Sequence, residues 1–209
     1  LDDNKNVFVC GNNDTGMVVH AGTYNHPKGK IFIAKLTPGL DSMIRLTKLV
    51  NMPKPGVTGF VSICGDVVVT LYLKDTGSLP TTSNAYQSGY SAYYFFHLSP
   101  GMDSLIYATY YGALNDSIRG GHAHGSSTID TNGVIWLSTC NLESKHLLPG
   151  TTGSYCPTSK TPAASGYDHL SVKFDMEVLA VKPIAGLEVS DTTCINSDIL
   201  FENQSVNAY

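Results

Sequence analysis

The sequence predicts an all-β protein of short antiparallel strands, and three observations support this fold class. The chain of 209 residues has only 14% charged residues but contains 20 Gly and 12 Tyr, which favours short strands joined by turns over long helices. The heptapeptide PGLDSMI at residues 38–44 returns as PGMDSLI at residues 100–106. Apolar segments around these copies recur about 60 residues apart, which indicates a structural repeat.

Two kinds of strand open each repeat. The first follows turn-forming residues and is predicted three times, as VFV (7–9), DVVVTLYL (66–73) and GVIWLSTC (133–140). The second is an apolar run and is predicted at residues 30–36, 93–98 and 170–174. Each is short and rich in β-branched or aromatic residues, as strands are.

Two further kinds of strand follow. A third is predicted after the Pro-Gly turn, at residues 43–49 and 104–112 and, in a degraded form, at residues 177–183. A fourth is predicted at residues 59–63 and 125–130, where it leads straight into the next first strand. Four short strands in a unit of roughly 40 to 60 residues are typical of a β-propeller blade.

The alternation of residues 67–72 indicates that the sheets stack. Val67 and Val69 alternate with Val68, so both faces of this strand are apolar. One such sheet cannot bury both of its own faces and needs a neighbour on each side. We therefore predict a partial β-propeller of four-stranded antiparallel blades, with about three blades in this chain, at residues 1–58, 59–124 and 125–183.

The middle unit contains motifs of a known family. Residues 79–117 read LPTTSNAYQSGYSAYYFFHLSPGMDSLIYATYYGALNDS. The order of its PTT, AYQ, Pro-Gly and YATYYG motifs resembles the SBBP-type bacterial β-propeller repeat. Residues 120–141 and 172–181 are similar to the last blade of very large secreted proteins of the gliding-motility-associated kind. Residues 184–209 are predicted to be a linker and the incomplete start of a PKD or immunoglobulin-like module, which this tail resembles.

This resemblance implies a location and a role. It implies an exported protein, extracellular or on the cell surface, in which a non-catalytic propeller acts as a structural scaffold, an adhesion module or a ligand-display module. We expect the chain to be the C-terminal part of a larger propeller, with the remaining blades and modules of that polypeptide as partners and surface glycans or other surface proteins as ligands. The alternative is a carbohydrate-binding or carbohydrate-processing propeller.

Composition argues against two other classes of protein. The formal net charge is −4 and the 13 Lys and Arg residues are scattered, whereas nucleic-acid binding needs clustered positive charge. No apolar segment approaches the roughly 18 to 20 residues that a transmembrane helix needs. We therefore predict neither a nucleic-acid partner nor a transmembrane segment.

Two sets of residues are predicted to have specific roles, one in a disulfide and one in ligand contact. The resemblance implies a disulfide between Cys140 and Cys156, because the corresponding family loop also carries Cys. Tyr86, Tyr90 and Tyr93 are candidate ligand-contact residues, because Tyr offers a flat apolar ring and a hydroxyl group. Their other interpretation is packing within strands and loops.

Other side chains suggest chemistry only weakly. His122 and His124 lie two residues apart and could share a metal on a strand, yet no neighbouring carboxylate or Cys completes such a site. The pairs Asp41-Ser42 and Asp103-Ser104 follow Pro-Gly and are interpreted as turn residues rather than parts of a hydrolase triad. Calcium is the one cofactor considered, at loop residues Asp14, Asp75 and Asp116. We predict no catalytic residue and no metal site.

Overall fold

The computed structural model is built from antiparallel strands, and the part of the chain that it describes contains no helix. The described residues are 1–2, 4–13, 16–50, 56–63, 66–73, 78–112, 125–130, 134–142, 153–154, 167–176, 187–189 and 201–203. Their strands are β1 (Val7–Asn12), β2 (Ile31–Leu36), β3 (Met43–Leu49), β4 (Gly56–Ile63), β5 (Asp66–Tyr72), β6 (Tyr93–Leu98), β7 (Leu105–Tyr111), β8 (Gly125–Ile129), β9 (Val134–Leu142), β10 (Tyr167–Asp175), β11 (Leu187–Val189) and β12 (Phe201–Asn203).

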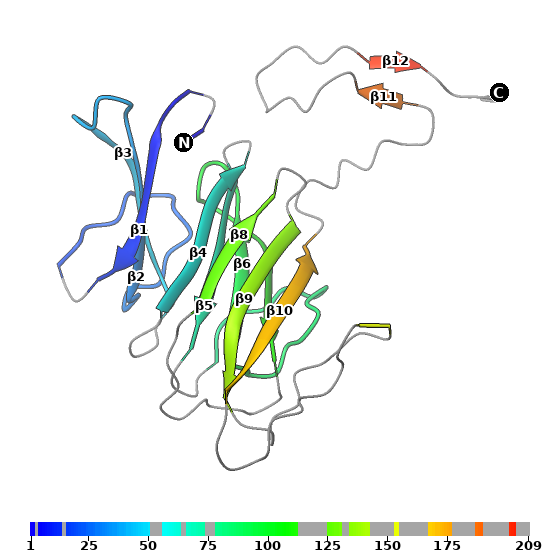
Figure 1. Cartoon of the computed structure of the whole chain (residues 1–209). Coiled ribbons are helices and arrows are strands. Elements are labelled where there is room, and N and C mark those ends of the chain that lie inside the picture. Colours follow the sequence, from blue (N-terminus) through cyan, green and yellow to red (C-terminus); the bar gives the residue numbers. More distant parts are fainter. Residues whose placement is uncertain are drawn as a thin grey trace.

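The strands form three successive sheets, each of which follows the order of the chain (Figure 1). The first sheet contains β1 to β3, the second β4 to β7 and the third β8 to β10, while β11 and β12 form a separate pair. β4 pairs with β5 and β8 with β9, so each of these predicted fourth strands opens a new sheet. The all-β, antiparallel prediction is therefore confirmed, with three or four strands in each of these sheets. The strand predicted at residues 177–183 lies outside the described residues.

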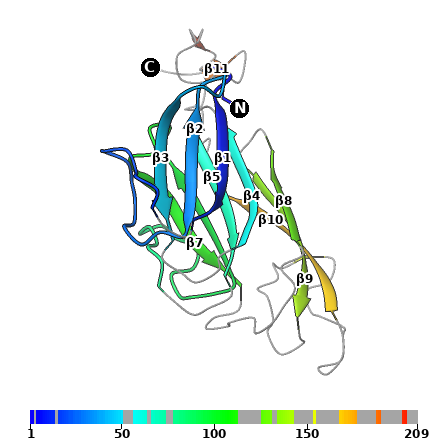
Figure 2. The same cartoon turned by 90° about the vertical axis from the view of Figure 1, so that its left-hand side faces the viewer.

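The middle sheet is buried on both faces. Val67, Val69 and Leu71 of β5 pack with Ile31 and Ile33 of the first sheet in one core. On the opposite face, Val68, Tyr72, Phe95 and Tyr111 pack with Ile135, Leu137 and Val172 of the third sheet in a second core. Figure 2 shows the first sheet facing the viewer, with the second sheet behind it. The three sheets are therefore stacked, as the apolar alternation of β5 predicts.

The two copies of the heptapeptide form the same hairpin. The amide of Leu40 donates to the carbonyl of Thr37 at 2.9 Å, and the amide of Met102 donates to that of Ser99 at 2.8 Å. Leu40 and Met102 also share a left-handed backbone, with φ of 59° and 54°. The strand register shifts just before both turns, between Lys35 and Leu36 and between His97 and Leu98. The two similar heptapeptides thus adopt the same turn at the same position in their sheets.

The outer strands β3 and β7 are covered in the same way. The amide of His20 donates to the carbonyl of Leu46 in β3, and the amide of Thr82 donates to that of Ala108 in β7. The fully buried hydroxyls of Thr47 and Thr109 then donate to the carbonyls of Tyr24 and Gln87 in the same covering segments. These segments satisfy strand edges that would otherwise recruit other chains.

Candidate functional site

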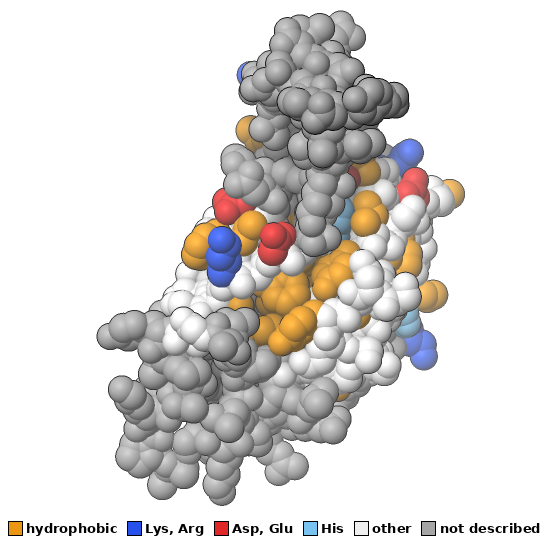
Figure 3. Space-filling model, turned by 90° about the vertical axis from the view of Figure 1, so that its right-hand side faces the viewer, with side chains coloured by type: hydrophobic (Ala, Val, Ile, Leu, Met, Phe, Trp, Pro, Cys, Tyr) orange, Lys and Arg blue, Asp and Glu red, His pale blue; other side chains and the backbone are white. Residues whose placement is uncertain are grey.

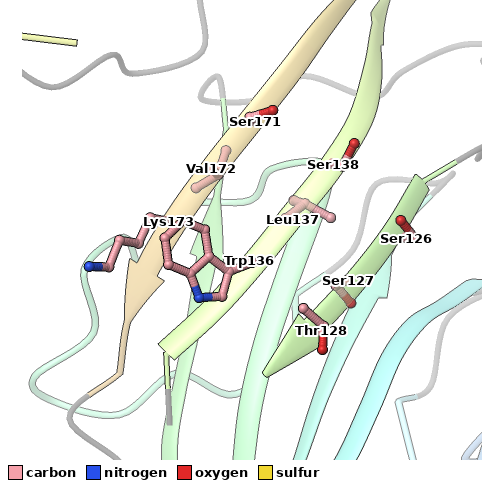
Figure 4. A pocket seen from close by; sticks show the side chains of 9 residues that line it. All are labelled: Ser126, Ser127, Thr128, Trp136, Leu137, Ser138, Ser171, Val172 and Lys173. Atoms are coloured by element: carbon pink, nitrogen blue, oxygen red, sulfur yellow. The ribbon is translucent and has the colours of Figure 1, made fainter. Parts of the chain in front are cut away.

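A shallow groove of about 440 Å³ crosses the outer face of the third sheet (Figure 4). Residues of β8, β9 and β10 line it. Leu137 of β9 and Val172 of β10 point into the second core, so the residues on either side of them in sequence face the groove. This face lies on the side of the sheet away from the second sheet.

The strand register arranges the groove residues in rows. One row contains Thr128, Trp136 and Lys173, which are direct cross-strand partners. The neighbouring row contains Ser126, Ser138 and Ser171, which are paired in the same way. Figure 4 shows the three serine side chains in line across the strands, with the Trp136 ring beside the Lys173 side chain. The groove therefore combines one aromatic ring with a line of hydroxyl groups.

Trp136 is held in place although its side chain is exposed. The residue is 46% exposed. Its Nε1–H donates to Oδ2 of Asp130 at 3.1 Å, and the Lys173 ammonium lies 5.2 Å from the centroid of the ring. A hydrogen bond and a cation–π contact together restrict how the ring can turn. These two contacts thus hold the exposed ring in one orientation.

The three candidate tyrosines do not share a surface. Tyr93 is 2% exposed and lies in the second core. Tyr90 packs against the first core, on the other face of the middle sheet. Tyr86 is 57% exposed. Tyr93 begins β6 whereas Tyr90 precedes this strand, and the two rings lie against different cores.

Tyr86 belongs to an aromatic cluster at the margin of the second core. Its ring centroid lies 6.2 Å from that of Tyr111 and 5.7 Å from that of Phe174, which it meets edge-on. Burial of Tyr111 raises the pKa of its hydroxyl to about 12. Figure 3 shows hydrophobic side chains gathered across the middle of the molecule's right-hand face, with acidic and basic side chains beside them. Tyr86 packs against Tyr111 and Phe174, while part of its own ring stays at the surface.

The predicted disulfide falls largely outside the described residues. Cys140 lies in β9, but its side chain and the whole of Cys156 are outside the described part of the chain. Cys64 and Cys194 lie outside it as well. Cys10 of β1 is a free thiol packed against the first core. The bridge between Cys140 and Cys156 stays a prediction.

The thiol of Cys10 is expected to resist alkylation in the folded protein. Burial raises its pKa to about 12, so at pH 8 the reactive thiolate is far scarcer than in the unfolded chain. Iodoacetamide labelling with peptide mass spectrometry should show Cys10 modified slowly in buffer and rapidly in urea. Equal rates in both solvents would contradict the packing of this thiol against the first core.

The Asp-Ser pairs act within their turns. The hydroxyls of Ser99 and Ser104 donate to Oδ1 of Asp103 at 2.6 and 2.7 Å, and these bonds lower the pKa of Asp103. In the other hairpin, Thr37 donates to Asp41 at 2.5 Å. His122, His124, Asp14, Asp75 and Asp116 lie outside the described residues. Within the described part of the chain, no group of three or more His, Cys, Asp or Glu side chains is placed to hold a metal ion.

The groove residues were missed from the sequence, although a signal for them exists. Ser171, Lys173 and Asp175 alternate with Val172 and Phe174 along β10. Such a strand buries one face and leaves the other in water. In β9 the same alternation places Trp136 on the other face of the sheet from the buried residues Ile135 and Leu137. The sequence does not show that Trp136 lies beside Lys173, because this depends on the pairing of β9 with β10.

Among the residues that the structure describes, no helix is long and apolar enough to cross a membrane. Comparisons with protein-family models, with curated proteins and with solved structures find no match for this chain.

Proposed function

We propose that the chain is a non-catalytic β-propeller segment of a large secreted or cell-surface bacterial protein. In this role it is a structural scaffold that displays loops and sheet faces for adhesion or ligand binding. The observation that carries the proposal is the middle sheet, which is buried between a sheet on each side. Stacked sheets with short antiparallel strands are what a propeller blade needs from its neighbours.

Two further observations support a blade-like repeat. The equivalent hairpins at residues 37–42 and 99–104 share their hydrogen bonds and their register shift. Strands β4 and β8 also approach each other closely, since a Cβ atom on Gly59 of β4 would lie 1.7 Å from Oγ of Ser127 of β8, which is hydrogen-bonded to Thr70 of β5 at 2.6 Å. The motifs of residues 79–117 add the resemblance to SBBP-type repeats. Together these features support a repeat of stacked, blade-like sheets.

The proposal is tested in the organism that makes the protein. An antibody against the 209-residue chain should label intact cells or the culture medium, and it should detect a much larger polypeptide after non-reducing electrophoresis. Brief protease treatment of intact cells should remove the labelling. If the antigen is confined to the soluble cell contents, the proposed exported scaffold is wrong. An antibody against a known cytoplasmic protein is the control for cell integrity.

A further inference from the structure

We propose that the outer face of the third sheet binds a neutral oligosaccharide, with the indole ring of Trp136 as its stacking platform. The inference goes beyond the proposed scaffold function, and it requires that no further sheet of the larger protein covers this face. A sugar ring presents C–H groups on its faces and hydroxyl groups around its rim. A site for it needs an exposed aromatic ring with hydrogen-bonding groups beside it.

The aromatic platform is present and already ordered. Trp136 leaves 46% of its surface exposed on a face whose other side chains are mostly polar. Its bond to Asp130 and its contact with Lys173 fix the ring, so a ligand would not have to order it. Ordering a side chain on binding costs conformational entropy, and this arrangement avoids that cost.

The hydrogen-bonding groups lie beside the ring. Ser126, Ser138 and Ser171 form a line across three strands, and neighbouring strands are about 4.8 Å apart. Ser126 and Ser171 are exposed, and Ser138 is half-buried. A hydroxyl both donates and accepts hydrogen bonds, as the hydroxyls of a sugar do. An oligosaccharide lying along this line would meet a hydroxyl at each strand.

The charges of the face favour a neutral ligand. Lys173 faces the groove, and Asp175 follows it on the same side of β10. Asp130 contacts the Trp136 ring. One positive and two negative side chains repel phosphate or uronate groups on balance. The same charges disfavour a further stacked sheet, because buried charges cost free energy unless they are paired.

The composition of the faces supports an open groove. The surfaces that stack inside this chain consist mainly of aliphatic and aromatic side chains, such as Ile33, Val69 and Phe95. The outer face of the third sheet instead presents hydroxyl and charged groups around one aromatic ring. The two rows of side chains that face the groove contain no aliphatic residue, whereas the stacking faces inside this chain do.

The experiment uses the emission of Trp136, which is the only tryptophan of the chain. The full chain is titrated with hexasaccharides of β-1,4-glucose, β-1,3-glucose, β-1,4-xylose and β-1,4-mannose, and with an oligogalacturonate as the charged probe. We expect at least one neutral probe to change the emission in a saturable way and the charged probe to leave it unchanged. Calorimetry with the responding probe should then show at least a tenfold loss of affinity in Trp136→Ala.

Two more variants keep the result interpretable. Ser138→Val replaces a groove hydroxyl by an apolar side chain that strands favour, and it should weaken binding about tenfold while the protein stays folded. Ile106→Ala removes an exposed apolar side chain of β7 in the second sheet and should leave the affinity unchanged. No emission change with any neutral probe would overturn the proposal, as would equal affinity in Trp136→Ala. A blue shift that grows with protein concentration alone would show instead that a second copy covers this face.

Discussion

Replacement of Phe95 by Ala is expected to lower the free energy of unfolding by about 3 to 5 kcal/mol. Phe95 lies in β6 and is fully buried in the second core. Its ring stacks on Tyr111 with centroids 5.9 Å apart and meets Phe174 of the third sheet at 5.2 Å. The substitution removes the ring that joins the second and third sheets and leaves a cavity that neighbouring strands cannot close. Urea denaturation followed by circular dichroism measures the loss.

A matched variant shows whether burial is the cause. Ile106 lies on the neighbouring strand β7 and is 46% exposed, so Ile106→Ala should change the free energy of unfolding by less than about 1 kcal/mol. Phe95→Leu should fall between the two, because it keeps most of the apolar volume. If Phe95→Ala costs no more than Ile106→Ala, the second and third sheets do not pack through this ring.

Much of the secondary structure could be predicted from the sequence. The repeated heptapeptide fixes its own hairpin through local contacts, because Thr37 and Ser99 each bond to residues within the same turn. Such short-range bonds depend on neighbouring residues alone. The predicted third strand at residues 43–49 accordingly matches β3, Met43–Leu49, and residues 93–98 match β6, Tyr93–Leu98.

The faces of the middle sheet could not be predicted in the same way. All six residues of β6 are buried, so no polar residue marks one side of this strand. Tyr93 therefore looks like Tyr94 in the sequence, although the first belongs to the second core and the other to the first core. The groove has the same limitation, because its rows depend on the pairing of strands that are distant in the chain. Alternation along a strand shows which residues share a face of the sheet, but it does not show which other sheet packs against that face.

Gly59→Ala is expected to lower the free energy of unfolding by about 2 to 3 kcal/mol through overpacking. Gly59 lies in β4 where the second sheet meets the third. A methyl group there would lie 1.7 Å from Oγ of Ser127 and 2.7 Å from Oγ1 of Thr70. These two hydroxyls are bonded to each other at 2.6 Å, so the methyl group would break this bond or push β8 away. Only a hydrogen atom fits at this close approach of the two sheets.

A double-mutant cycle separates this steric contact from other effects of the substitution. Ser127→Gly removes the hydroxyl that the new methyl group would meet, at the cost of its bond to Thr70. Gly59→Ala should then cost at least 1 kcal/mol less in the Ser127→Gly background than in the wild type. Urea denaturation of the four proteins gives the coupling energy directly. A coupling energy of zero would mean that β4 and β8 do not approach each other in solution. The scaffold proposal would then lose the interface between the second and third sheets, which is one of the two interfaces that support it.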